Sequence, residues 1–219
     1  MDNKSTAQEV EIILDKASHM GALNTPHRAR GIVLFAHGSG SSRSSPRNRY
    51  VASVLQDAGI ATLLFDLLIE EEDLVYETRF DIDLLTHRLR DTTTWLMQQQ
   101  QLQHLAIGYF GASTGAAAAL KAAATLGKVI KAVVSRGGRP DLAAPDLSRV
   151  RAPTLLIVGG YDDVVIELNR SAHSQLQCIK ELQIIPGATH LFEEPGTLEQ
   201  VAQLASKWFE KYLNRLKAE

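Results

Sequence analysis

A serine flanked by glycines stands near the middle of the chain, where Gly111-Ala112-Ser113-Thr114-Gly115 matches the pattern G-x-S-x-G. An apolar run that predicts a strand precedes it, and an alanine-rich run that predicts a helix follows it. A serine on a sharp, strained turn needs neighbours with little or no side chain, and both flanks are glycine. The motif therefore predicts that Ser113 is an exposed nucleophile at a strand end. The alternatives are a tight turn without chemistry and a phosphate-binding loop at a helix N-terminus.

A neutral serine hydroxyl is a weak nucleophile, so it needs a histidine to take its proton and an acid to hold that histidine. Both follow downstream, each after a predicted strand: Asp162 and Asp163 after residues 154–158, and His190 after residues 181–185. The two aspartates compete for the role of acid. The other one is expected to cap the helix that begins at about residue 164.

Six further histidines compete with His190 for the role of general base. Most fit other roles: His87 and His173 fall within predicted helices, and His104 opens a strand at the wrong end of the sheet. The full set of competitors is His19, His27, His37, His87, His104 and His173. His37 is expected to be structural and to bond the backbone of its own loop. His190 is the predicted base.

An anionic tetrahedral intermediate needs backbone N–H donors, which two segments can supply. Thr114 follows the nucleophile, and Ser39 lies in the loop after the strand that ends at Ala36, with Gly40 as the next choice. Arg136 follows a central strand and is a candidate to bind a small anionic substrate. An ion pair with the acidic run 70–73 or with Asp141 is the competing interpretation.

Strands and helices alternate along the chain, which predicts a mostly parallel sheet with helices on both faces. The apolar strands are buried on both faces, and sites in such sheets lie at the carboxyl ends of strands. The expected strands are 8–14, about 17–23, the apolar run 31–38 with the oxyanion loop after Ala36, 60–66, 104–110, 129–135, 154–158 and 181–185. The expected helices are about 46–58, 79–100, 114–126, 164–177 and 197–216, the last with an apolar stripe that packs on the sheet.

Length and composition predict one globular domain over residues 1–219 and exclude several classes of protein. The chain is 45% hydrophobic and 22% charged, with a formal net charge of −2. Without a basic stripe, nucleic acid and anionic membrane surfaces are not expected partners. The single cysteine, Cys178, and the absence of a leader or long apolar run lead us to expect a cytoplasmic protein, either a monomer or a homodimer.

Four segments give the chain a resemblance to the α/β-hydrolase superfamily and to its small, lidless, dienelactone-hydrolase-like branch. They are LFAHGSGSSR, GYFGASTGAAAAL, LLIVGGYDDVV and GATHLFEEPG. The resemblance implies an α/β-hydrolase fold, Asp162 as the acid, and His190 as the base. Dienelactone hydrolase itself has a cysteine nucleophile and a glutamate near the oxyanion loop, whereas this chain has Ser113 and no glutamate in its HGSG loop.

Together these features predict a cofactor-free and metal-free serine hydrolase that cleaves a small ester or lactone with water through an acyl-enzyme. Thioester hydrolysis, amide hydrolysis and acyl transfer use the same triad and remain open. A ligand-binding protein that keeps the hydrolase fold without turnover is the alternative from another class.

Overall fold

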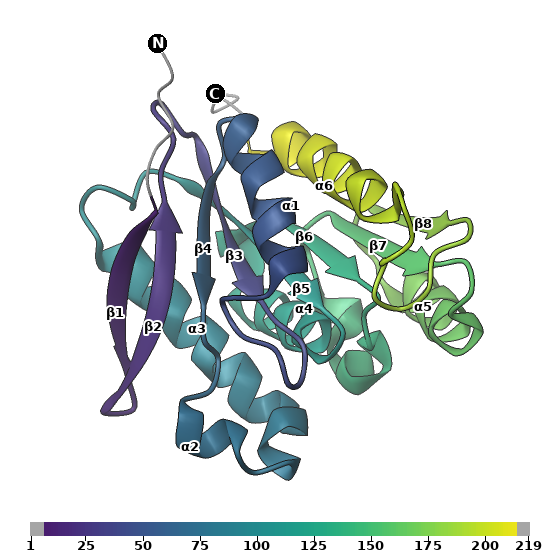
Figure 1. Ribbon diagram of the computed structural model, residues 1–219, viewed down its shortest axis with the longest axis horizontal. Helices are drawn as coiled ribbons and strands as arrows, with labels where there is room; N and C mark the ends of the chain where they lie inside the picture. The colour runs from purple at the N-terminus through teal and green to yellow at the C-terminus, as the bar shows by residue number, and fades with distance from the viewer. Residues whose placement is uncertain (1–6, 214–219) are drawn as a thin grey trace.

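The computed structural model describes residues 7–213, which form one eight-stranded sheet between two layers of helices (Figure 1). The strand order is β1-β2-β4-β3-β5-β6-β7-β8. The first hairpin is antiparallel and β2 pairs antiparallel with β4, whereas all later neighbours are parallel. The strands are β1 Gln8–Leu14, β2 Ala17–Asn24, β3 Gly31–Ala36, β4 Ala61–Phe65, β5 Ala106–Ala112, β6 Ile130–Arg136, β7 Thr154–Gly159 and β8 Lys180–Ile185.

Helices cover both faces of the sheet because each parallel crossover lays a helix on one face. One face packs against α1 and α6, and the other against α3, α4 and α5. The α-helices are α1 Pro46–Asp57, α2 Glu70–Asp73, α3 Ile82–Gln98, α4 Thr114–Leu126, α5 Asp163–Gln175 and α6 Thr197–Leu213. The 3₁₀ segments are η1 Glu77–Phe80, η2 Gly127–Val129 and η3 Pro140–Arg149.

The small side chains of α4 let this helix lie close to the centre of the sheet. Ala116, Ala117, Ala118 and Ala119 are all fully buried. β3 and β5 are also buried along almost their whole length, as predicted for strands covered on both faces. α4 is therefore held firmly behind the strand end that carries Ser113.

The predicted α/β-hydrolase fold with a mostly parallel sheet is confirmed, and the main error concerns residues 70–100. The acidic run 70–73, which was not among the expected helices, forms the short helix α2. The helix expected at 79–100 begins only at Ile82, because the Asp81 carboxylate caps it by accepting from the Leu84 N–H at 2.9 Å. The helix also ends at Gln98, where Gln99 turns to an extended conformation.

As far as residue 213, the last helix follows the prediction closely. Four members of the apolar stripe on α6 are buried in the core: Val201, Ala205, Trp208 and Tyr212. The predicted end of this helix at residue 216 lies outside the described residues. Within residues 7–213, no helix has both the length and the apolar character needed to cross a bilayer.

Candidate active site

Ser113 lies on a strained turn between β5 and α4. Its backbone has φ 51° and ψ −120°, a conformation that costs energy for any residue with a side chain. Hydrogen bonds hold it there: the Ser113 N–H donates to the Arg136 carbonyl at 3.2 Å, and the Ser113 carbonyl accepts from the Arg139 N–H at 3.1 Å. The turn presents Ser113 at the carboxyl end of β5.

Glycines permit the close packing around this turn. A Cβ on Gly115 would lie 2.2 Å from the Ala36 carbonyl oxygen, and one on Gly111 would lie 2.4 Å from the Ala116 Cα. A Cβ on Gly38 would meet the Ser113 Cβ at 3.1 Å. Strand β3, the turn and the start of α4 are therefore in direct contact, which explains both glycines of the motif.

Asp162 and His190 are joined directly, as predicted. The His190 Nδ1 lies 2.6 Å from the Asp162 Oδ2. The expectation that Asp163 caps α5 is wrong: Asp162 holds the N-cap position, without a side-chain capping bond, and Asp163 is the first residue of the helix. The Asp162 carboxylate is thus left to the histidine.

The segment after β6 brings His190 next to the serine turn. Gly137 has φ 52°, and a Cβ there would lie 3.4 Å from the His190 Cε1, so the imidazole packs directly over this glycine. Two residues later, Arg139 bonds the carbonyl of Ser113. No hydrogen bond joins the Ser113 and His190 side chains. Sequence reasoning missed Gly137, for which the pair Gly137-Gly138 directly after a strand was the available signal.

The loop that carries His190 is closed by a carboxylate. Glu194 accepts from the Thr189 hydroxyl at 2.6 Å and from the Thr189 N–H at 3.1 Å. These hydrogen bonds, led by the one from the hydroxyl, lower the pKa of Glu194. The loop also contains Phe192 at φ 56°, a buried side chain that anchors it to the core.

The expected oxyanion donors Ser39 and Thr114 are neighbours, although the Ser39 N–H already has a partner. It donates to the Thr114 Oγ1 at 3.0 Å. Gly40 follows with φ 65°.

His37 has the predicted structural role. Its Nδ1 bonds the Gly38 carbonyl at 3.0 Å, and its Nε2 accepts from the Leu67 N–H at 3.0 Å. Burial lowers the pKa of His37, so a neutral ring holds the loop in place.

Arg136 is the last residue of β6 and is buried, with 7% of its surface exposed. Neither competing ion pair is formed: Asp141 binds Arg139, and Glu72 of the acidic run binds Arg88. The interpretation of Arg136 as half of an ion pair is therefore wrong.

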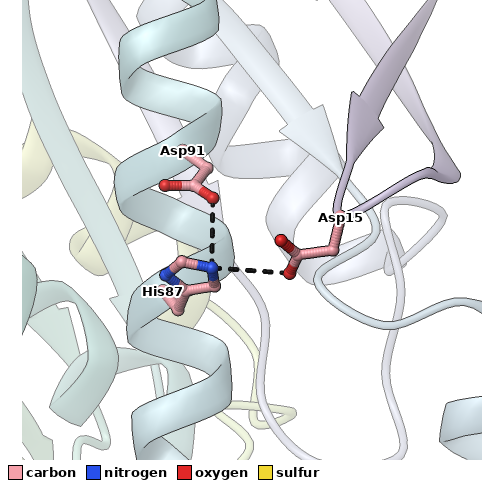
Figure 2. A group of neighbouring side chains, drawn as sticks. All are labelled: Asp15, His87 and Asp91. Carbon is pink, nitrogen blue, oxygen red and sulfur yellow. Dashed lines mark ion pairs between the residues drawn. The ribbon is translucent and has the colours of Figure 1, made fainter.

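One group of side chains among residues 7–213 has the composition of a metal site, and it lies away from the serine turn. Asp15, His87 and Asp91 place their ligand atoms within 4.8 Å of one another (Figure 2). The Asp15 oxygen that faces the histidine already binds the Arg88 guanidinium at 2.6 Å. The group ties the edge hairpin to α3, so we interpret it as an ion-pair cluster rather than part of the active site.

Comparisons with known proteins find the same fold in solved structures. A crystal structure named dienelactone hydrolase from Anabaena variabilis is 57% identical and superposes with a TM-score of 0.95, covering 97% of this chain and 100% of that one. Est1E from Butyrivibrio proteoclasticus shares the fold at 16% identity, with a TM-score of 0.80 over 93% of this chain and 98% of its own.

A curated Mycobacterium tuberculosis protein, provisionally named a phosphoribosyl transferase, is 58% identical over 206 residues. The match covers 94% of this chain and 46% of that protein, so the chain spans about half the length of this relative. The model of the dienelactone hydrolase family matches residues 22–219. The chain belongs to the dienelactone hydrolase family.

Proposed function

We propose that this chain is a serine hydrolase that cleaves a small ester or lactone through an acyl-enzyme. The observation that carries the proposal is the Asp162–His190 pair, in which the carboxylate Oδ2 and the ring Nδ1 are 2.6 Å apart. The His190 ring packs over Gly137, in the segment that bonds to the strained turn of Ser113. Membership of the dienelactone hydrolase family supports hydrolysis as the reaction class. Dienelactone hydrolase itself uses a cysteine nucleophile. Because this chain has a serine in that position, we propose other small esters and lactones, rather than dienelactone, as its substrates.

The proposed reaction begins when Ser113 Oγ attacks the substrate carbonyl while His190 Nε2 accepts its proton. Asp162 accepts from the Nδ1–H and stabilises the imidazolium that forms. Collapse of the tetrahedral intermediate breaks the ester bond, and His190 gives its proton to the leaving alcohol. A water activated by the same histidine then releases the acid.

The lack of a hydrogen bond between the Ser113 and His190 side chains is compatible with this role, because catalytic hydrogen bonds in unliganded enzymes often tighten only on substrate binding. The N–H groups of Thr114 and Ser39 are the proposed oxyanion donors. Ser39 must then exchange its present acceptor, the Thr114 hydroxyl, for the oxyanion. Its present bond keeps this donor directed toward the serine turn.

The mechanism requires neither a metal nor a cofactor. We also propose that the protein is cytoplasmic and that it is a monomer or a homodimer. The transferase name of the mycobacterial relative describes a protein about twice as long, and we do not propose that activity for this domain.

A panel of short p-nitrophenyl esters and lactones, assayed with the wild type and Ser113→Ala, tests this proposal. We expect turnover that Ser113→Ala abolishes. Turnover that persists in Ser113→Ala, or ligand binding by a folded protein that hydrolyses nothing, would contradict it and favour a binding protein of hydrolase fold.

A further inference from the structure

The short segment that follows β6 contacts both halves of the proposed catalytic apparatus. The Arg139 N–H donates to the Ser113 carbonyl at 3.1 Å, and the His190 ring packs over Gly137. Gly138, between these two residues, is pressed against its surroundings, because a Cβ there would lie 2.7 Å from a side-chain carbon of α4. The position of this segment therefore determines where the imidazole lies relative to the serine.

The side chain of Asn169 holds this segment from α5. Its Nδ2 donates to the Gly138 carbonyl at 3.0 Å and to the carbonyl of Val165, in its own helix, at 2.8 Å. Asp162 is the N-cap of the same helix, about two turns earlier, so both side chains project from the same side of α5. One hydrogen bond thus links the helix that carries the acid to the segment that holds the serine turn.

The amide of Asn169 is costly in this position. The residue is fully buried, and its Oδ1 has no hydrogen-bond partner among residues 7–213. A buried oxygen without a partner destabilises the fold, and asparagine is a poor residue for a helix interior. An alanine would favour α5 itself at no such cost. The carbonyl that the amide holds therefore explains this residue better than the stability of the helix does.

We propose that Asn169 is a positioning residue, whose hydrogen bond to the Gly138 carbonyl fixes the Asp162–His190 pair relative to Ser113. The inference rests on the proposed function and adds to it a residue that acts through the backbone of Gly138. Without this bond, the segment after β6 can shift relative to α5, and the serine and the imidazole lose their alignment. A displacement of about 1 Å at a reacting group can lower a rate by about 10²-fold.

Two substitutions of Asn169 and one control test this role. Asn169→Ala deletes the amide, whereas Asn169→Asp keeps its shape but has only acceptors once the carboxyl is ionised. The control, Thr154→Val, removes a buried hydroxyl that donates to the Ala152 carbonyl at 2.9 Å. Thr154 begins β7, so it lies at the opposite end of this strand from Asp162. Because each substitution removes a buried hydrogen bond, all three should lower the unfolding temperature.

Ester hydrolysis separates a positioning role from a purely structural one. Asn169→Ala should lower kcat by about 10- to 100-fold and change KM by no more than a few fold, whereas Thr154→Val should keep the wild-type kcat. The kcat of Asn169→Asp, divided by the wild-type kcat at the same pH, should fall as rising pH ionises the new carboxyl. A kcat of Asn169→Ala within a few fold of the wild type, or an equal loss in Thr154→Val, would overturn the inference and leave the esterase proposal intact.

Amide hydrogen exchange, followed by NMR, tests the inference without any substrate. The observed group is the Arg139 N–H, which donates to the Ser113 carbonyl. Its exchange should be faster in Asn169→Ala than in Thr154→Val, by more than the difference in their global stabilities accounts for. Equal exchange in the two variants, after that correction, would overturn the inference whether or not the wild type hydrolyses esters. A wild type without turnover would contradict the esterase proposal alone.

Discussion

Asp162 occupies the N-cap of α5 without capping it, and its carboxylate is used instead by His190. A carboxylate on Nδ1 keeps the imidazole in the tautomer whose Nε2 can accept the serine proton, and it stabilises the imidazolium. Asp163, although adjacent, belongs to the first turn of the helix and is exposed. Two neighbouring residues of one type thus differ completely in role.

This difference gives a paired prediction at the two aspartates. Asp162→Asn should lower kcat by about 10³- to 10⁴-fold, because the amide can stabilise the wrong tautomer and cannot neutralise the imidazolium. Asp163→Asn should change kcat by no more than a few fold. Steady-state ester hydrolysis by both variants, with circular dichroism to verify folding, makes the comparison. Equal losses in the two variants would contradict the assignment of the acid.

The buried guanidinium of Arg136 should lower the stability of the unliganded protein. This is a second prediction at the scale of one residue. Because burial lowers the pKa of Arg136 to about 10, well below the ordinary value of a guanidinium, the folded state holds its proton less tightly than the unfolded state. The penalty is therefore fully present below pH 10 and is relieved only as the pH rises above that value. Arg136→Met should raise the free energy of unfolding at neutral pH by about 1–3 kcal/mol.

Denaturant unfolding of Arg136→Met measures this effect, with Arg170→Met as the control because Arg170 is an exposed cation of α5 that pairs with Glu167. The free energy of unfolding of the control should stay within about 0.5 kcal/mol of the wild-type value. A marked destabilisation by Arg136→Met would instead mean that the guanidinium is part of the structural core.

At the scale of the elements, the position of the serine turn between β5 and α4 depends on how closely α4 packs against β3. Gly115→Ala places a Cβ 2.2 Å from the Ala36 carbonyl oxygen, so helix and strand must move apart. We expect a loss of about 2–3 kcal/mol in stability and a large fall in kcat, because the serine turn moves with the helix.

Gly59→Ala is the control for this substitution. Gly59 has φ 77° and nothing within 4 Å of an added Cβ, so it reports the cost of backbone strain alone, about 1 kcal/mol. Thermal unfolding and ester hydrolysis are measured for both variants. If Gly115→Ala lost no more stability than Gly59→Ala and kept its activity, the close contact would not be needed.

Much of this unit could be predicted from the sequence, because glycine spacing and apolar runs are local signals. The helix at 114–126 was predicted with its observed bounds, whereas β5 continues to Ala112, beyond the predicted end at residue 110. The glycine suggested a strand end, but Gly111 and Ala112 still pair with Ser135 and Arg136 of β6. Local composition does not reveal such a ladder between distant segments.

The difference between local signals and contacts of distant segments also separates the predicted parts of the candidate site from the missed ones. The residue types and chain order of Ser113, Asp162 and His190 were visible in the sequence. That Arg136 forms no ion pair with Asp141 or the acidic run could not be predicted, because Asp141 pairs with Arg139 and Glu72 pairs with Arg88 only in the folded chain. The role of Gly137 likewise depends on a packing contact across more than fifty residues of sequence.

At the scale of the whole molecule, the segment between β6 and β7 is short. It consists of the 3₁₀ segment η3 and a few flanking residues rather than a lid. Without a lid to open at an oil–water interface, the rate should not jump when an ester exceeds its solubility. Hydrolysis of p-nitrophenyl esters of increasing chain length, across each solubility limit, measures this. A sharp rise above the limit would contradict an open site.

The position of the ion-pair cluster at the edge of the sheet gives a further prediction. β1 and β2 form one edge, while Asp162 and His190 follow β7 and β8 near the other, so Asp15 and His87 should not influence turnover. Prolonged treatment with EDTA should leave ester hydrolysis unchanged, and His87→Ala should behave like the wild type. Activity that is lost with EDTA, restored by a divalent metal and absent in His87→Ala would contradict this.

The central claim is that Ser113 is a nucleophile activated by His190, and covalent labelling tests it without knowledge of the substrate. The wild type, Ser113→Ala and His190→Ala are treated with a fluorophosphonate probe, and adducts are measured by intact mass and located by peptide mapping. The account predicts one adduct, on Ser113, that is absent from Ser113→Ala and strongly reduced in His190→Ala. A folded wild-type protein that forms no adduct, or an adduct on another residue, would contradict it.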